Sequence, residues 1–204
     1  MKTLICMGDS LTEGSDIPVG HTWSELAGNA LNIEVVNGGI GGDTSAGMLA
    51  RFHGQLSARK PSFVFILGGT NDLWWGWEVN TVLGNLFSMV VQARHQGAAP
   101  VIGLPLPVNI PAAKAAGFSP PMDGYDRFIE KLEALVDALI VHASESEVVL
   151  VDLHGPFLTD QRIIKEALFL PDGLHPNRAG HQVIADAVVA AFRQDFGFNA
   201  SAST

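Results

Sequence analysis

The sequence contains a single cysteine, Cys6, among its 204 residues. A lone cysteine excludes an internal disulfide, and the histidines show no metal-ligand spacing, so we expect no bound metal. Cys6 lies in an apolar run, which predicts a buried small side chain rather than a reactive thiol. The glycine-rich turns lack phosphate-loop and dinucleotide-binding patterns, and we therefore expect no cofactor.

Basic residues are also scarce. The chain has 12 Lys and Arg against 21 Asp and Glu, a formal net charge of −9, which excludes a nucleic-acid backbone as an expected partner. No apolar run reaches membrane-spanning length, and too few residues precede Gly8 for a secretory leader. We therefore expect no integral membrane segment and a cytoplasmic protein, or a secreted or periplasmic one if a signal peptide has been removed. The oligomeric state stays open.

The chain is rich in apolar residues, which make up 47% of it, and its mean hydropathy is +0.23. These values exclude a disordered protein, and the length suits one domain with a sizeable core. No repeat, low-complexity segment or linker divides the sequence. We expect a single domain over residues 1–196 and a flexible tail over residues 197–204.

Short apolar runs alternate with segments of helical periodicity. The runs predict buried strands at residues 3–7, 33–37, 62–67, 100–104 and 147–152. Helices are expected at about 23–31, 45–56, 80–95 and 128–143, and in a final segment that includes residues 183–192. This alternation predicts a five-stranded parallel sheet covered on both faces, which is a three-layer α/β/α sandwich of flavodoxin-like type.

Polar clusters follow the carboxyl ends of these strands, where open α/β sheets bind ligands. Ser10 follows the first strand, and it either caps the next helix or exposes a hydroxyl to a substrate. His175 is the best candidate for a base, and Asp172 is close enough in sequence to orient its ring. His154, two residues after Asp152, is a rival base. A Ser, His and Asp set supplies the nucleophile, base and orienting carboxylate of acyl transfer.

Acyl transfer also needs hydrogen-bond donors for a developing oxyanion. Glycine lets the backbone turn so that amide groups face outward without an obstructing side chain. The backbone amides of Ser10 and Gly42 and the side-chain amide of Asn71 are the expected donors. Asp9 and Asp72, which neighbour these residues, are expected to brace their own turns.

These residues form four blocks that resemble those of the GDSL, or SGNH, hydrolases. The blocks, in the family's order, are Gly8-Asp9-Ser10-Leu11, Gly42, Gly69-Thr70-Asn71-Asp72 and Asp172-Gly173-Leu174-His175-Pro176. The second block is the loosest match: Gly38, Gly39 and Gly41 compete with Gly42, which we prefer because Gly42-Asp43-Thr44 is most similar to the family's form. The resemblance implies the SGNH hydrolase fold, with Ser10 as nucleophile, His175 as base and Asp172 orienting it.

The resulting interpretation is a serine esterase that acts through an acyl-enzyme. The resemblance implies small-molecule substrates: acyl or aryl esters, lysophospholipids or thioesters. A carbohydrate deacetylase with the same catalytic residues is a second enzyme reading. A binding module without activity is an alternative of another class, although no member of the catalytic set is missing.

Aromatic residues close to the Asn71 block suggest where a substrate binds. Trp74, Trp75 and Trp77 either line an apolar acyl or aryl pocket or pack against neighbouring loops. Residues 105–122 include five of the eleven prolines, so this segment cannot be regular throughout. We expect it to form another wall of the pocket, with Phe118 and Met122 in contact with substrate.

Overall fold

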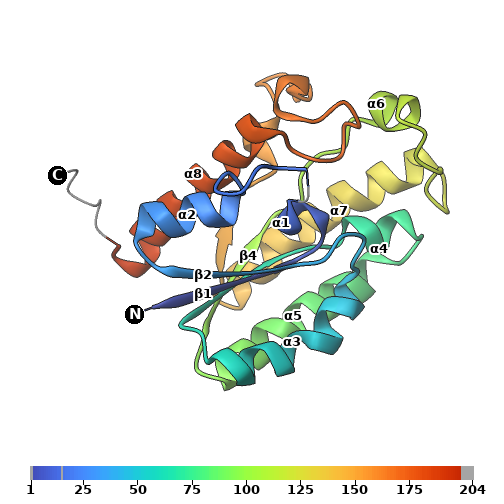
Figure 1. Ribbon diagram of the computed structural model, residues 1–204. Helices are drawn as coiled ribbons and strands as arrows, with labels where there is room; N and C mark the ends of the chain where they lie inside the picture. The colour runs from blue at the N-terminus through green and yellow to red at the C-terminus, as the bar shows by residue number, and fades with distance from the viewer. Residues whose placement is uncertain (1, 15, 199–204) are drawn as a thin grey trace.

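The computed structural model describes residues 2–14 and 16–198 and consists of one parallel sheet between two layers of helices (Figure 1). The strands lie in the order β2-β1-β3-β4-β5, and every pairing is parallel. Their bounds are β1 (Thr3–Gly8), β2 (Glu34–Gly39), β3 (Phe63–Leu67), β4 (Ala99–Gly103) and β5 (Val149–Val151). This order is that of flavodoxin-like folds, so the predicted fold class is confirmed.

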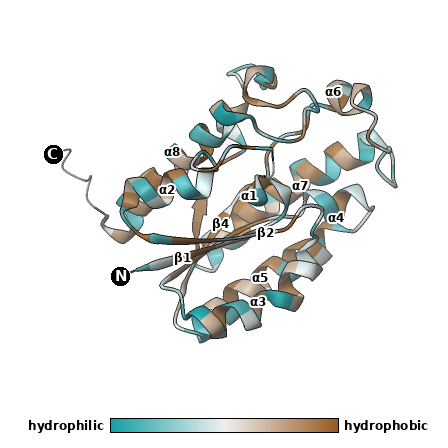
Figure 2. Cartoon of the chain, in the orientation of Figure 1, coloured by the Kyte–Doolittle hydropathy of each residue, from teal (hydrophilic) through white to brown (hydrophobic). Residues whose placement is uncertain are grey.

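Hydrophobic burial explains why the central runs form strands. All five residues of β3 are buried, as are five of the six in β1. Cys6 is fully buried within β1, and burial raises the pKa of its thiol above the ordinary value, as expected for a packing residue. The strands are mostly hydrophobic in Figure 2, whereas the helices alternate between hydrophobic and hydrophilic residues.

Two helices cover one face of the sheet and three cover the other (Figure 1). The first group is α2 (Trp23–Leu31) and α8 (Arg178–Phe196), and the second is α3 (Ser45–Arg59), α5 (Val79–His95) and α7 (Tyr125–Glu145). Trp23 and Phe192 are buried on the first face, and Phe52 and Phe128 on the second. Each helix thus presents one apolar side to the sheet.

Predicted and observed ends differ by no more than three residues for the five strands and for the four predicted helices that correspond to α2, α3, α5 and α7. The final predicted segment, residues 183–192, lies within α8. Several short elements leave no recognisable pattern in the sequence, because one or two helical turns have too little periodicity to detect. They are α1 (Ser10–Glu13), α4 (Thr70–Trp74), α6 (Ile110–Ala115) and the 3₁₀ turns Gly155–Phe157 and Glu166–Leu168. Helix α6 lies in the proline-rich segment, which is therefore partly regular.

At the carboxyl-terminal end of the chain, Phe198 contacts the rings of Phe63 and Phe192. The rest of the predicted tail, residues 199–204, lies outside the described residues. Within the described part of the chain, no helix is both long enough and apolar enough to span a membrane.

The strand order reverses at β1, because the chain pairs β2 on one side of it and β3 on the other. Open α/β sheets bind ligands beyond the carboxyl ends of the strands at such a switch point. Ser10 begins α1 directly after β1, and Asn71 lies in α4 directly after β3. The topology therefore places both candidate residues at one edge of the sheet.

Gly8, at the end of β1, allows α1 to fold back tightly onto the strand. A Cβ at this position would lie 2.1 Å from Thr12 Oγ1 and 2.8 Å from the Leu67 carbonyl oxygen. The turn that presents Ser10 thus depends on the missing side chain.

Gly8→Ala should therefore lower the free energy of unfolding by about 1–3 kcal/mol, the usual cost of overpacking. Gly84→Ala is the matched control: Gly84 is exposed within α5, and a Cβ there would meet no atom within 4 Å. The free energy of unfolding of Gly84→Ala should rise by up to about 1 kcal/mol, because alanine has a higher helix propensity than glycine. Urea denaturation of both variants tests this, and equal stabilities would contradict the close packing of α1 on β1.

Candidate active site

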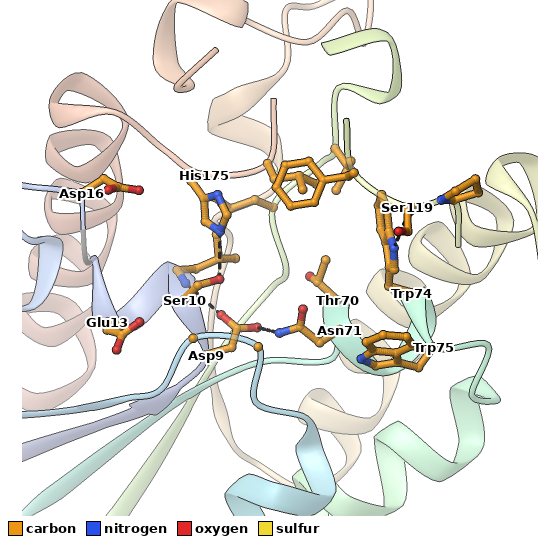
Figure 3. Close-up of a pocket in the computed structure, with 18 residues that line it drawn as sticks. Asp9, Ser10, Glu13, Asp16, Thr70, Asn71, Trp74, Trp75, Ser119 and His175 are labelled. Carbon is orange, nitrogen blue, oxygen red and sulfur yellow. Dashed lines mark hydrogen bonds between the residues drawn. The ribbon is translucent and has the colours of Figure 1, made fainter. Parts of the chain in front are cut away.

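Ser10 is the first residue of α1, and Asp9 is its N-cap. The Asp9 side chain accepts a hydrogen bond from the Leu11 amide at 2.9 Å, and the Asp9 carbonyl accepts from the Glu13 amide. The cap satisfies two amides at the start of this short helix. The capping role belongs to Asp9, and the Ser10 hydroxyl lies at the edge of the sheet (Figure 3).

Three side chains from the two ends of the chain form a hydrogen-bonded row. Ser10 Oγ lies 3.0 Å from His175 Nε2, and His175 Nδ1 lies 2.6 Å from Asp172 Oδ2. Figure 3 shows the Ser10–His175 contact. These distances lie within hydrogen-bonding range, and the arrangement is that of a nucleophile, a base and an orienting carboxylate.

The Asp172 carboxylate is stabilised in its ionised form. Partial burial raises its pKa, but hydrogen bonds from the His175 amide, the His175 ring and the Leu174 amide bring the pKa below its ordinary value. An ionised carboxylate only accepts hydrogen bonds, so His175 Nδ1 carries the proton toward Asp172. In a neutral ring Nε2 is then the acceptor that faces the Ser10 hydroxyl.

The loop that carries His175 is anchored by α6 and its N-cap, Asn109. The Asn109 amide donates to the Gly173 carbonyl at 2.9 Å, and the Asn109 side chain donates to Glu166. Gly173 has a positive φ of 67°, and a Cβ there would lie 2.7 Å from the Asn109 carbonyl oxygen. The close approach of α6 therefore requires glycine between Asp172 and His175.

Gly42 and Asn71 line the same cavity as Ser10. Gly42 has a positive φ of 75°, and a Cβ there would meet no atom within 4 Å, so its surroundings are open. Asn71 Nδ2 donates to the Asp43 carbonyl at 2.9 Å and lies 3.4 Å from Asp9 Oδ2. The structure thus places Ser10, Gly42 and Asn71 around one cavity. The Asp43 carbonyl holds one N–H of the Asn71 amide, and the 3.4 Å contact with Asp9 is longer than an ordinary hydrogen bond, so the second N–H is weakly held.

Asp9 and Asp72 are both buried. Asp9 accepts from the Leu11 amide of its own turn, as expected, whereas Asp72 accepts from Ser45 in another segment and not only within its own loop. Burial raises the pKa of Asp9 to about 7, although the Leu11 amide and the His175 charge oppose this rise. Burial also raises the pKa of Asp72, which accepts from the amide and the hydroxyl of Ser45 at the start of α3.

A cavity of about 550 Å³ opens beside Ser10 and His175, and its two sides differ in character (Figure 3). Glu13 and Asp16 lie on the Ser10 side, whereas Trp74 and Trp75 lie opposite. The apolar and aromatic residues that line it are Leu11, Trp74, Trp75, Leu106, Val108, Phe118, Pro120 and Leu174. The cavity can therefore accommodate an apolar group next to the Ser10 hydroxyl.

The structure separates the five predicted substrate-contact residues into two groups. Trp74, Trp75 and Phe118 line the cavity, and Trp74 Nε1 donates to the Ser119 carbonyl at 3.0 Å. Trp77 and Met122 are exposed by 36% and 70%, and they lie outside the set of described lining residues.

Leu106, Val108 and Leu174 also line the cavity, although they were not predicted to contact substrate. Leu106 and Val108 belong to the proline-rich segment that was expected to form a wall, and Leu174 lies in the block with His175. The proline-rich segment therefore indicated where a wall of the cavity lies. The sequence of an irregular loop does not reveal which of its side chains face the cavity.

The rival base, His154, is buried away from this cavity. Its Nδ1 lies 2.9 Å from the Pro105 carbonyl oxygen and its Nε2 lies 3.5 Å from Glu133. His181 is also buried, and its Nδ1 accepts a hydrogen bond from the Trp23 amide at 3.0 Å. Burial lowers the pKa of His181 to about 4, and the nearby charge of His175 acts in the same direction.

The contacts among Ser10, His175 and Asp172 are of the kind that serine hydrolases use, on a fold that also hosts other functions. The model of the GDSL-like lipase/acylhydrolase family matches residues 6–183, and this chain therefore belongs to that family. The resemblance identified from the four sequence blocks is thereby confirmed.

Individual relatives match across most of the chain. An arylesterase of Vibrio mimicus is 29% identical over 192 residues, which cover 92% of this chain and 86% of the relative. Esterase TesA of Pseudomonas aeruginosa is 30% identical over 193 residues, with the same coverage. A crystal structure of a lipolytic G-D-S-L family member from Veillonella parvula superposes with a TM-score of 0.78 at 22% identity, covering 95% of this chain and 100% of that one.

The buried neutral His181 should make the fold sensitive to acid. Because its pKa is about 4 when folded and about 6.5 when unfolded, the unfolded state binds more protons between these pH values. Stability should therefore fall as the pH drops from about 6.5 to 4, by on the order of 3 kcal/mol from this residue.

His181→Gln keeps a side-chain oxygen that can accept from the Trp23 amide but does not titrate. Its free energy of unfolding should be lower than that of wild type at pH 7, and the difference should shrink at pH 4.5. Urea denaturation at both pH values measures it. A difference that stays constant with pH would contradict a neutral His181 in the folded state.

Proposed function

We propose that this protein is a carboxylic-ester hydrolase in which Ser10 is the nucleophile and an acyl-enzyme is the intermediate. The observation that carries the proposal is the 3.0 Å contact between Ser10 Oγ and His175 Nε2, with Asp172 on the other ring nitrogen. Family membership and relatives named as esterases support it. Each of the three side chains has a partner suited to its role in acyl transfer.

In the acylation step, His175 Nε2 removes the Ser10 proton as Oγ attacks the ester carbonyl. Asp172 stabilises the imidazolium ion that forms. The tetrahedral intermediate collapses when the C–O bond to the alcohol breaks, and His175 returns the proton to the departing alcohol. In deacylation, His175 removes a proton from water as the water attacks the acyl-enzyme, and the carboxylic acid leaves while Ser10 regains its proton.

The proposed oxyanion hole consists of the Ser10 and Gly42 amides and the Asn71 side-chain amide. Two features support it: Ser10, Gly42 and Asn71 line one cavity, and the Asp43 carbonyl fixes the Asn71 side chain. Donors that are already oriented stabilise developing charge without reorganisation, and loss of one typically costs about 3–4 kcal/mol in the transition state.

We propose acyl or aryl esters, including thioesters and lysophospholipids, as the substrate class. The apolar wall formed by Trp74, Trp75 and Phe118 supports an apolar acyl or aryl group in the cavity. An acetylated carbohydrate, the alternative substrate, would have Glu13 and Asp16 as hydrogen-bond partners on the Ser10 side, but any hydroxyl groups against the rings on the opposite side would be less well satisfied. The complete Ser10, His175 and Asp172 set argues against a binding module without activity.

Ser10→Ala should abolish hydrolysis of p-nitrophenyl butyrate, because no other group at this position can form the acyl-enzyme. The same substitution should prevent labelling by a fluorophosphonate probe, which reacts with activated serines. Stopped assays and in-gel detection measure the two effects, with circular dichroism confirming that the variant is folded. Activity or labelling that persists in the folded variant would reject Ser10 as the nucleophile.

Trp75→Ala should change acyl-chain preference, because Trp75 lines the cavity and is 55% exposed, so its removal leaves the core intact. We expect kcat/KM for octanoyl esters to fall about fivefold relative to acetyl esters, equivalent to about 1 kcal/mol of apolar contact.

Trp77→Ala is the matched comparison, since its ring is also partly exposed but lies outside the set of described lining residues. It should alter the ratio of octanoyl to acetyl rates less than Trp75→Ala does. Equal profiles for Trp75→Ala and wild type would show that Trp75 does not contact the acyl chain.

A further inference from the structure

Asp43 lies in the segment that joins β2 to α3, residues 40–44. Its carbonyl oxygen accepts from Asn71 Nδ2 at 2.9 Å, and its Oδ1 accepts from the Thr44 amide at 2.9 Å. Its Oδ2 accepts from Arg51 Nε at 2.9 Å and lies 2.8 Å from Arg51 Nη2. One residue therefore connects Asn71 of the proposed oxyanion hole with the charged side chain of Arg51.

Arg51, on α3, also contacts the ends of two strands. Its Nη1 donates to the Gly38 carbonyl at 2.7 Å in β2, and its Nη2 donates to the Gly8 carbonyl at 3.0 Å in β1. The Arg51 and Asp43 side chains are only 19% and 12% exposed, so water screens this ion pair weakly. The planar guanidinium thus holds three separate segments in fixed relative positions.

We propose that the Arg51–Asp43 ion pair positions the oxyanion hole relative to the nucleophile, and this inference rests on the proposed function. Asp43 directly follows Gly42 in sequence and binds Asn71, so a displacement of Asp43 moves both donors. Arg51 binds the Gly8 carbonyl, two residues before Ser10. Both residues act through others and are positioning residues.

The surrounding contacts show that the segment is built around this pair. A Cβ on Gly47 would lie 2.0 Å from Asp43 Oδ1. Glycine near the start of α3 therefore avoids a clash with the Asp43 carboxylate. Ser45, the residue of α3 that follows the segment, is held independently, because Asp72 accepts from its amide and hydroxyl. The Arg51–Asp43 pair controls the part of the segment that contains Gly42.

Charge gives the pair a second effect on catalysis. An unpaired Asp43 carboxylate next to the hole would repel the negative charge that develops on the substrate oxygen. Arg51 neutralises this carboxylate. Removal of Arg51 alone should therefore lower kcat more than removal of both charges does. A residue with a purely structural role would not show this pattern.

Steady-state kinetics with p-nitrophenyl butyrate test the proposal, normalised by active-site titration with a fluorophosphonate. We expect Arg51→Met to lower kcat by about 10- to 100-fold while KM changes less than threefold. Asp43→Asn should lower kcat less than Arg51→Met does. The double variant Arg51→Met/Asp43→Asn should have a kcat at least threefold higher than that of Arg51→Met. Arg51→Lys, which keeps the charge but not the planar fork, should lie between wild type and Arg51→Met.

Arg127→Met is the control, because Arg127 pairs with Glu130 on the exposed surface of α7 and should leave kcat unchanged. If Arg51→Met does not fold, Arg51→Lys and Asp43→Asn carry the same comparison of kcat with KM. The proposal is overturned if Arg51 and Asp43 variants keep kcat within twofold of wild type, if only KM changes, or if the double variant loses as much as the two single losses combined.

Ser10→Ala, measured in parallel, separates this proposal from the proposed function. Full activity in Ser10→Ala would overturn the serine mechanism and the positioning role with it. An inactive Ser10→Ala together with unchanged kcat in the Arg51 and Asp43 variants would overturn the positioning role alone.

Discussion

The hydrogen bond between Ser10 Oγ and His175 Nε2 joins residues that are 165 positions apart, and the arrangement of the site depends on it. One partner follows the first strand and the other precedes the last helix, so the contact forms only when the whole sheet is assembled. The Asn109 amide holds the second partner's loop through Gly173. A parallel sheet suits this task because the carboxyl ends of its strands meet at one edge.

Two carboxylates near this contact, Asp172 and Asp9, have pKa values that differ with their burial and with the hydrogen-bond donors around them. Asp172 accepts from two amides and from the His175 ring, which lowers its pKa and keeps it charged. Asp9 is almost completely buried with the Leu11 amide as a close donor, and its pKa rises to about 7. The same carboxyl group is thus ionised next to the His175 ring at Asp172, and is a much weaker acid that caps helix α1 at Asp9.

The cavity combines this polar edge with an apolar wall from other parts of the chain. Trp74 and Trp75 belong to or directly follow α4, while Leu106, Val108 and Phe118 come from the segment after β4. The Trp74 indole donates to the Ser119 carbonyl and so joins the two segments. Helix α4 therefore serves both sides of the site, since Asn71 lies in its first turn and Trp74 at its end.

The sequence alone determined the alternation of strands and helices, because burial and periodicity are local properties of each run. It also indicated Ser10, Asn71, Asp172 and His175 as candidate site residues, because they lie in short motifs next to strand ends or turns. Only the tertiary structure decided which aromatic rings line the cavity and that Arg51 joins Asp43 to two strand ends. Those contacts link segments that are distant in sequence, and no local pattern records which side chains meet when the sheet closes around them.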